Sequence, residues 1–137
     1  MPGTDIDNGR YVMRRRVDAE PKVVEERVRA ALGEEGFGVL TEIDVAATLR
    51  SKLGVDTPSY VILGACKPTY AHRALELEPE LGALLPCNVV VRAHPDGGSE
   101  VIAIDPNVML GLASAPELAD LAQVVAEELR ATLERVG

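Results

Sequence analysis

The chain has 137 residues, a formal net charge of -8 and only 3% aromatic residues. A chain of this length forms one domain with its own hydrophobic core. Its acidity and its lack of Trp argue against nucleic acid as a partner, because phosphates attract cationic surfaces and unpaired bases stack on aromatic rings. The sequence has no apolar stretch long enough to span a membrane and no secretory signal, so we expect a cytoplasmic protein without a membrane partner.

The predicted elements follow one another within a single domain at residues 11–137, after a polar leader at residues 1–10 that we expect to be flexible. Alternating or continuous runs of β-branched residues predict strands, and apolar residues at helical spacing predict amphipathic helices. In chain order we expect a strand at 11–17, a helix at 18–32, a strand at 37–43, a short helix at 44–53, a strand at 60–65, a helix at 69–78, a hairpin of strands at 88–94 and 99–105, and a long helix at 118–133.

Two of the predicted strand segments, 60–65 and 101–104, are apolar on both faces. Such segments are covered on both sides, either by helices or by a second copy of the protein. Because only two long amphipathic helices are predicted, we favour a homodimer, and central strands beneath helices on both faces are the alternative. About five strands with these helices indicate an α+β or α/β domain.

Three separated blocks of the sequence resemble a bacterial family, the domain-of-unknown-function family 302. The blocks are EEGFGVLTEIDVAATLRSKLG at 34–54, YVILGACKPTYAHRALELEPELGALLPCNVVV at 60–91 and VIAIDP at 101–106. The resemblance implies a small α+β domain, similar to the TATA-box-binding-protein-like arrangement, with a mainly antiparallel sheet and two long helices on one face. It also implies a homodimer. It implies no activity, and an acidic chain with this fold is not thereby a DNA-binding protein.

The two cysteines, Cys66 and Cys87, stand at the ends of predicted strands. If these strands are antiparallel neighbours, as the resemblance implies, the end of one and the start of the next lie at the same sheet edge. The two thiols then approach one another. In a parallel arrangement they would lie about 20 Å apart, since a strand rises ~3.3 Å per residue.

Several side chains near Cys66 suit it for chemistry. A helix is predicted to begin just after it, and a helix N-terminus favours a thiolate. Lys67 adds a cation, and His72 lies within the first turns of that helix as a candidate base or ligand. Cys66, His72 and Cys87 together offer three ligands for zinc or copper, although their spacing matches no established zinc motif.

Each of these residues also has an ordinary structural interpretation. Free cysteines in a cytosolic protein are most often small buried side chains. A helical histidine is most often partly exposed without a special role, and Lys67 is most often solvated. Asn88, beside Cys87, is expected either to satisfy backbone groups at the strand end or to contribute to binding.

Three functional hypotheses follow. The first is a homodimeric module that binds a small ligand or metal near Cys66, Lys67, His72, Cys87 and Asn88. The second is a thiol-dependent redox enzyme in which Cys66 attacks and Cys87 resolves, which requires an accessible Cys66 of low pKa. The third is a purely structural or interaction dimer, which requires buried and inert cysteines. The sequence identifies no cofactor.

Overall fold

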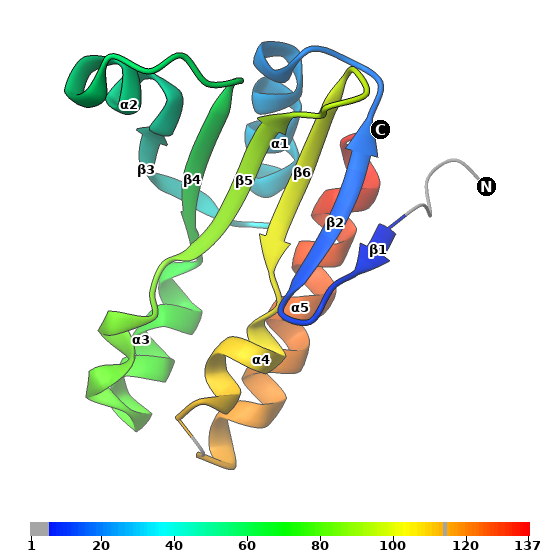
Figure 1. The fold of residues 1–137 in the computed structure, drawn as a ribbon. Helices are drawn as coiled ribbons and strands as arrows, with labels where there is room; N and C mark the ends of the chain where they lie inside the picture. The colour runs from blue at the N-terminus through cyan, green and yellow to red at the C-terminus, as the bar shows by residue number, and fades with distance from the viewer. Residues whose placement is uncertain (1–5, 114) are drawn as a thin grey trace.

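The structure is a computed structural model that describes residues 6–113 and 115–137. The chain forms one antiparallel sheet of six strands in the order β1-β2-β6-β5-β4-β3 (Figure 1). The predicted α+β class is confirmed. The strands are β1 (Ile6–Asn8), β2 (Val12–Val17), β3 (Gly38–Asp44), β4 (Tyr60–Cys66), β5 (Cys87–Ala93) and β6 (Ser99–Ile104).

The sheet has one strand more than the five expected. The additional strand, β1, lies within the segment expected to be a flexible leader and pairs with β2 through Ile6 and Arg15. A segment of three residues is too short to show a hydrophobic pattern that would predict a strand. Its pairing with β2, the ion pair of Arg14 with Asp7 and a hydrogen bond from Arg130 to Asn8 hold it in place. Residues 1–5 of the expected leader lie outside the described part of the chain.

Helices connect and cover the strands. The elements are α1 (Pro21–Glu34), α2 (Val45–Leu53), α3 (Pro68–Leu77), a 3₁₀ turn η2 (Pro79–Ala83), α4 (Pro106–Gly111) and α5 (Glu117–Arg135). The short helix α4 was not predicted, although the Asp105 side chain accepts a hydrogen bond from the backbone N–H of Asn107 at 2.9 Å and Pro106 occupies the first helical position. Both are ordinary signals for the start of a helix.

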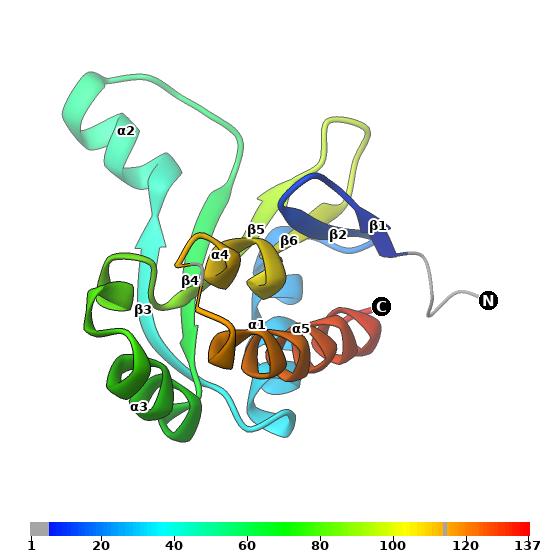
Figure 2. The same cartoon turned by 90° about the horizontal axis from the view of Figure 1, so that it is seen from below.

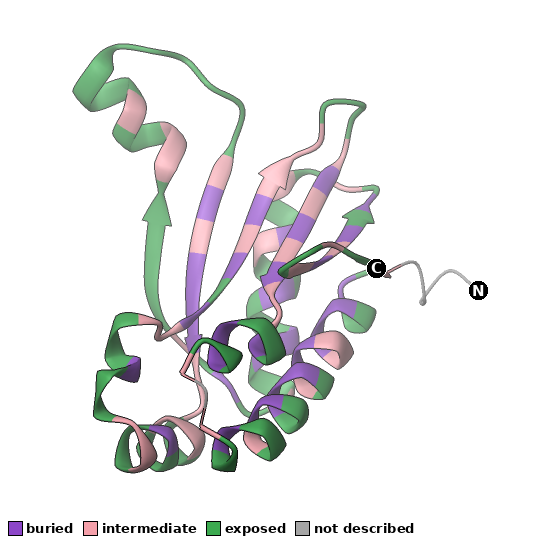
Figure 3. Cartoon of the chain, turned by 60° about the horizontal axis from the view of Figure 1, so that its bottom comes forward, coloured by how far each residue is buried: buried purple, intermediate pink, exposed green. Residues whose placement is uncertain are grey.

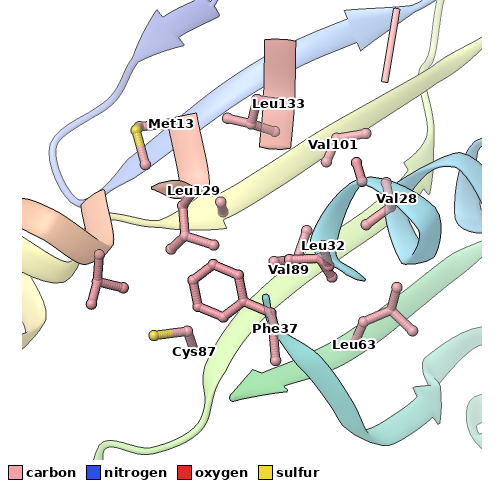
Figure 4. Packing of buried hydrophobic residues seen from close by; sticks show 14 of the residues in the cluster. Met13, Val28, Leu32, Phe37, Leu63, Cys87, Val89, Val101, Leu129 and Leu133 are labelled. Carbon is pink, nitrogen blue, oxygen red and sulfur yellow. The ribbon is translucent and has the colours of Figure 1, made fainter. Parts of the chain in front are cut away.

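The two long helices, α1 and α5, lie together on one face of the sheet, as predicted (Figure 2). Between them and the sheet is a core of mainly aliphatic side chains, among which lies the ring of Phe37 (Figure 4). Arg15 of β2 points into this layer and is 6% exposed. Its guanidinium donates hydrogen bonds of 2.8 Å to the carbonyl oxygens of Leu133 and Glu134, so it satisfies groups that the C-terminal end of α5 leaves free.

The other face of the sheet has no helix packed over its centre among the described residues. Glycine occupies one position on this face, Gly64 of β4, because a Cβ atom there would collide with Thr41 and would lie 2.8 Å from Pro86. The helix α2 projects beyond the sheet at the β3 and β4 end (Figure 2). None of the described helices is long and apolar enough to cross a membrane.

Candidate functional site

A small pocket lies at the edge of the sheet where β4 ends and β5 begins. The helices α3, α4 and α5 close it from the other sides, and it encloses about 40 Å³. A cavity needs roughly 10–15 Å³ of such volume to hold one water, so this pocket has room for a small chemical group. The wall is mainly apolar and is formed by Phe37, Ala65, Cys66, Lys67, Tyr70, Ala71, Ala74, Leu85, Pro86, Cys87, Pro106, Met109, Leu110, Leu121 and Val125.

The antiparallel pairing of β4 and β5 brings the two cysteines to this pocket. Ala65 lies directly opposite Cys87, and Cys66 follows one residue later. Both thiols are free, Cys66 partly buried and Cys87 buried. The sheet edge is therefore shared, as expected for antiparallel neighbours.

Burial in the pocket disfavours the thiolate form of both cysteines. Burial raises the pKa of the Cys66 thiol above its ordinary value. Burial, and after it the charge of the neighbouring Cys66, raises the pKa of Cys87 to about 11. This direction is opposite to the lowering of the Cys66 pKa that was expected from the start of α3.

Lys67 forms the polar part of the wall. Its ammonium is 2.8 Å from a carboxylate oxygen of Glu128 on α5, and both side chains are largely shielded from solvent, at 15% and 24% exposure. The same ammonium lies 5.0 Å from the centre of the Phe37 ring and 4.8 Å from that of Tyr70. Aromatic faces attract a cation, so the ammonium is held by two rings and one carboxylate. Lys67 is not simply solvated.

Two other groups complete this cluster. The Tyr70 hydroxyl donates a hydrogen bond of 3.4 Å to the same carboxylate oxygen of Glu128. The second oxygen, Oε1, is buried without a hydrogen-bond partner among the described residues. Gly36 adopts a φ of 86°, and a Cβ there would lie 3.0 Å from the Lys67 side chain, so the glycine leaves room for the lysine stem.

His72 and Asn88 do not join the pocket. The His72 side chain is 78% exposed, with its Nε2 3.7 Å from a carboxylate oxygen of Glu76, one turn further along α3. It faces outward because the pocket side of α3 is formed by Tyr70, Ala71 and Ala74. Asn88 is exposed because its neighbour Cys87 points inward and side chains alternate along a strand.

The set of Cys66, His72 and Cys87 is therefore not assembled as a metal site. Within residues 6–113 and 115–137, no three His, Cys, Asp or Glu side chains are grouped so as to hold a metal ion. The sequence placed His72 close to Cys66 along the chain, but the helical rotation between them turns the imidazole to solvent. Of the five residues predicted for a site, the pocket contains Cys66, Lys67 and Cys87.

The site also contains residues that sequence reasoning missed. Tyr70 follows Lys67 by one helical turn, so its proximity was available from the predicted helix. Glu128 lies 61 positions beyond Lys67, and no local pattern connects the two. Phe37, the only phenylalanine of the chain, was assigned to a strand and its ring was not expected beside a lysine.

Comparisons with known proteins agree with this fold. The uncharacterized conserved protein DUF302 from Bacillus stearothermophilus has a crystal structure similar to this one, with a TM-score of 0.87 and 30% sequence identity over 94% of this chain and 100% of that chain. No functionally curated protein matches the sequence. The family model described as domain of unknown function DUF302 matches residues 13–136. With nearly the whole chain matched, the protein belongs to the DUF302 family.

Proposed function

We propose that this protein is a cytoplasmic homodimeric module that binds a small ligand in the pocket beside Cys66 and Cys87. The observation that carries the proposal is the composition of the pocket wall. An apolar cavity with two protonated thiols has a single ammonium, that of Lys67, on its wall. Sites of this kind bind the apolar part of a ligand by burial and fix its orientation through a few polar groups.

The wall favours a short ligand with an apolar body and an acceptor head group. Lys67 carries three N–H donors, of which one is directed to Glu128. A carboxylate or carbonyl oxygen is the natural acceptor for another. The body enters between Cys66 and Cys87, where the cavity of about 40 Å³ limits it to a few non-hydrogen atoms. Short-chain carboxylic acids have this chemistry.

The same wall weighs against turnover by a cysteine nucleophile. Such chemistry depends on the thiolate, whereas burial raises the pKa of Cys66 and of Cys87. Lys67 does not offset this effect, because its ammonium is directed to Glu128 and to two aromatic rings. Two free thiols in one pocket also fit a reducing compartment, which supports the cytoplasmic assignment.

The test is a titration of the protein with acetate, propionate, butyrate and valerate, followed by two-dimensional amide NMR. We expect shifts of amides at the end of β4, the start of α3 and the start of β5, with an optimum chain length. Lys67→Met should weaken binding at least ~10-fold, as expected for the loss of a charged partner. Lys52→Met is the matched control, because Lys52 is an exposed lysine on α2.

Two results would overturn the binding proposal. One is the absence of pocket shifts with every acid of the series. The other is equal affinity in wild type, Lys67→Met and Lys52→Met, which would show that binding does not use the Lys67 ammonium. The dimeric state is tested separately by sedimentation velocity, where a monomer at micromolar concentration would contradict it.

A further inference from the structure

We propose that α2 and the open face of the sheet form the interface of a two-fold dimer, in which α2 of each copy packs on the open face of the other. This inference rests on the homodimeric state of the proposed function and names its surface. The surface comprises three parts: the helix α2, the apolar centre of the open face and the groove between them.

The helix α2 is folded although none of its side chains is buried in the core. It has nine residues, and none of them is buried (Figure 3). Helices this short are marginal in water, and in proteins their stability comes mostly from packing of an apolar face. Asp44 caps α2 through a 2.9 Å hydrogen bond from the backbone N–H of Ala47, and Gly54 ends it in the left-handed region. These capping interactions fix the two ends of α2, but they do not bury any of its side chains.

The apolar residues of α2 form a stripe that requires a partner. Val45, Leu49 and Leu53 recur at intervals of four and lie on one side of the helix. Leu53 is 69% exposed, and Val55, just beyond the helix, is 43% exposed. Val45 and Leu49 are partly buried, so the stripe is incompletely covered within the chain and is most exposed at Leu53. An incompletely covered apolar stripe of this kind indicates an interaction surface.

On the open face of the sheet, apolar residues lie directly beside one another on neighbouring strands and form a row. The register places Ile43 beside Ile62, Ile62 beside Val90 and Val90 beside Ile102. Because side chains alternate between faces, these four share the face opposite to α1 and α5. The three on β4, β5 and β6 are only partly buried, and Ile43 is 50% exposed. This row, called the floor below, spans four strands of the sheet.

The charged residues around this row are already paired within the chain. Arg14 and Asp7 form an ion pair of 2.6 Å, and Arg92 and Glu100 one of 3.0 Å. Arg16 donates hydrogen bonds of 3.0 Å to backbone carbonyl oxygens of the β5–β6 turn. Arg14 and Arg92 therefore have carboxylate partners within the chain, and Arg16 is directed to the turn rather than to the row, so the row itself suits an apolar counterpart.

A groove separates the helix from the floor. It lies between Val45 and Leu49 of α2 and Tyr60 and Arg92 of the sheet, with a volume of about 280 Å³ and a mainly apolar wall. Within one chain α2 does not close onto the sheet at this point. The groove is large enough to receive apolar side chains from a second molecule.

The arrangement favours a second copy as the occupant. An apolar helix and an apolar floor stand side by side on the same chain, so a two-fold axis places the helix of each copy on the floor of the other. Strand and helix dimensions give floor and helix together a projected area on the order of 500 Å². Side chains that project from these two surfaces add to this contact area. The total then approaches the roughly 800 Å² per partner that stable complexes bury.

The experiment measures the dimer in sedimentation velocity with a thiol reductant present, at concentrations from below 1 µM to about 100 µM. Leu53→Asp changes the helix and Ile43→Lys changes the floor. Leu112→Asp is the matched control, because Leu112 is 71% exposed but lies at the end of α4, away from both parts. We expect a wild-type dimer that each of the first two variants weakens at least ~10-fold, and a control that behaves like wild type.

Hydrogen exchange gives a second readout that does not depend on the variants. In wild type, amides of Val45–Leu53 should exchange slowly at high concentration and quickly after dilution, because the interface protects the helix. Protection that does not change with dilution would overturn the inference. A dimer that survives both Leu53→Asp and Ile43→Lys would overturn this surface and leave the homodimer intact, whereas a wild-type monomer at every concentration, or capture of a different protein by that monomer, would overturn both.

Discussion

The two faces of the sheet are built from neighbouring residues of the same strands, yet they differ in what covers them. On β4, Leu63 is fully buried beneath the helices, whereas the adjacent Ile62 on the opposite face is only partly buried. On β6, Val101 and Ile102 differ in the same way. Within the described residues, strands that are apolar on both sides are covered by helices on only one of them.

The largest expected effect separates the two faces directly. Leu63→Ala removes a side chain of 0% exposure and should lower the free energy of unfolding by about 3 kcal/mol, because it leaves a cavity under the helices. Ile62→Ala should cost about 1 kcal/mol in the monomer, since water already reaches that side chain. Urea denaturation at low protein concentration measures both.

The same pair of variants also sharpens the dimer proposal. If a second copy covers Ile62, the cost of Ile62→Ala should grow with protein concentration, and that of Leu63→Ala should not. Equal costs for the two variants in dilute solution would contradict the distinction between a covered and an open face.

A smaller effect on the free energy of unfolding is expected from two arginines, Arg15 on the covered face and Arg92 on the open face. Arg15→Met removes two hydrogen bonds from a guanidinium to the Leu133 and Glu134 carbonyl oxygens at the end of α5, and should cost about 2 kcal/mol. Arg92→Met breaks a partly exposed ion pair with Glu100 on the open face and should cost less than about 1 kcal/mol. Thermal unfolding with circular dichroism measures the difference, and a larger cost for Arg92→Met would contradict it.

The smallest effect is a pH dependence on the covered face. Burial raises the pKa of Cys87 from 9.0 to about 11, so the unfolded chain loses this proton at lower pH than the folded one. The stabilisation is complete below pH 9 and decreases as the pH rises toward 11. Between pH 8 and pH 10 it should fall by about 1 kcal/mol. The Cys87→Ala variant provides the comparison, and an equal fall in both proteins would show that other groups cause it.

Most of the fold follows from local patterns in the sequence. The predicted ranges of the long helices and of the hairpin agree with the structure because apolar spacing and turn residues act over a few positions. The exceptions have a common cause. The strand β1 is held by its pairing with β2 and by a hydrogen bond from Arg130 of α5 to Asn8, and α4 is so short that its apolar residues show no period. Strand pairing leaves no pattern in a three-residue segment, and the start of α4 is marked in the sequence only by Asp105 and Pro106.

Less of the site could be predicted. The approach of Cys66 to Cys87 followed from antiparallel pairing, which the family resemblance implied. The ion pair of Lys67 with Glu128 joins two elements far apart in sequence, and the exposure of His72 depends on which side of α3 meets the pocket. Sequence proximity favoured His72, whereas tertiary packing selected Tyr70 and Glu128.

The bare backbone at Gly64 has a consequence for how this surface tolerates change. Thr41 and Pro86 fill the space that a side chain would need, so the position accepts no other residue without movement of both neighbours. Substitutions on the open face are thus tolerated best at positions on either side of Gly64. The close packing of Thr41 and Pro86 on the backbone of β4 thus makes Gly64 a fixed point of this face, whereas the side chains around it can be exchanged.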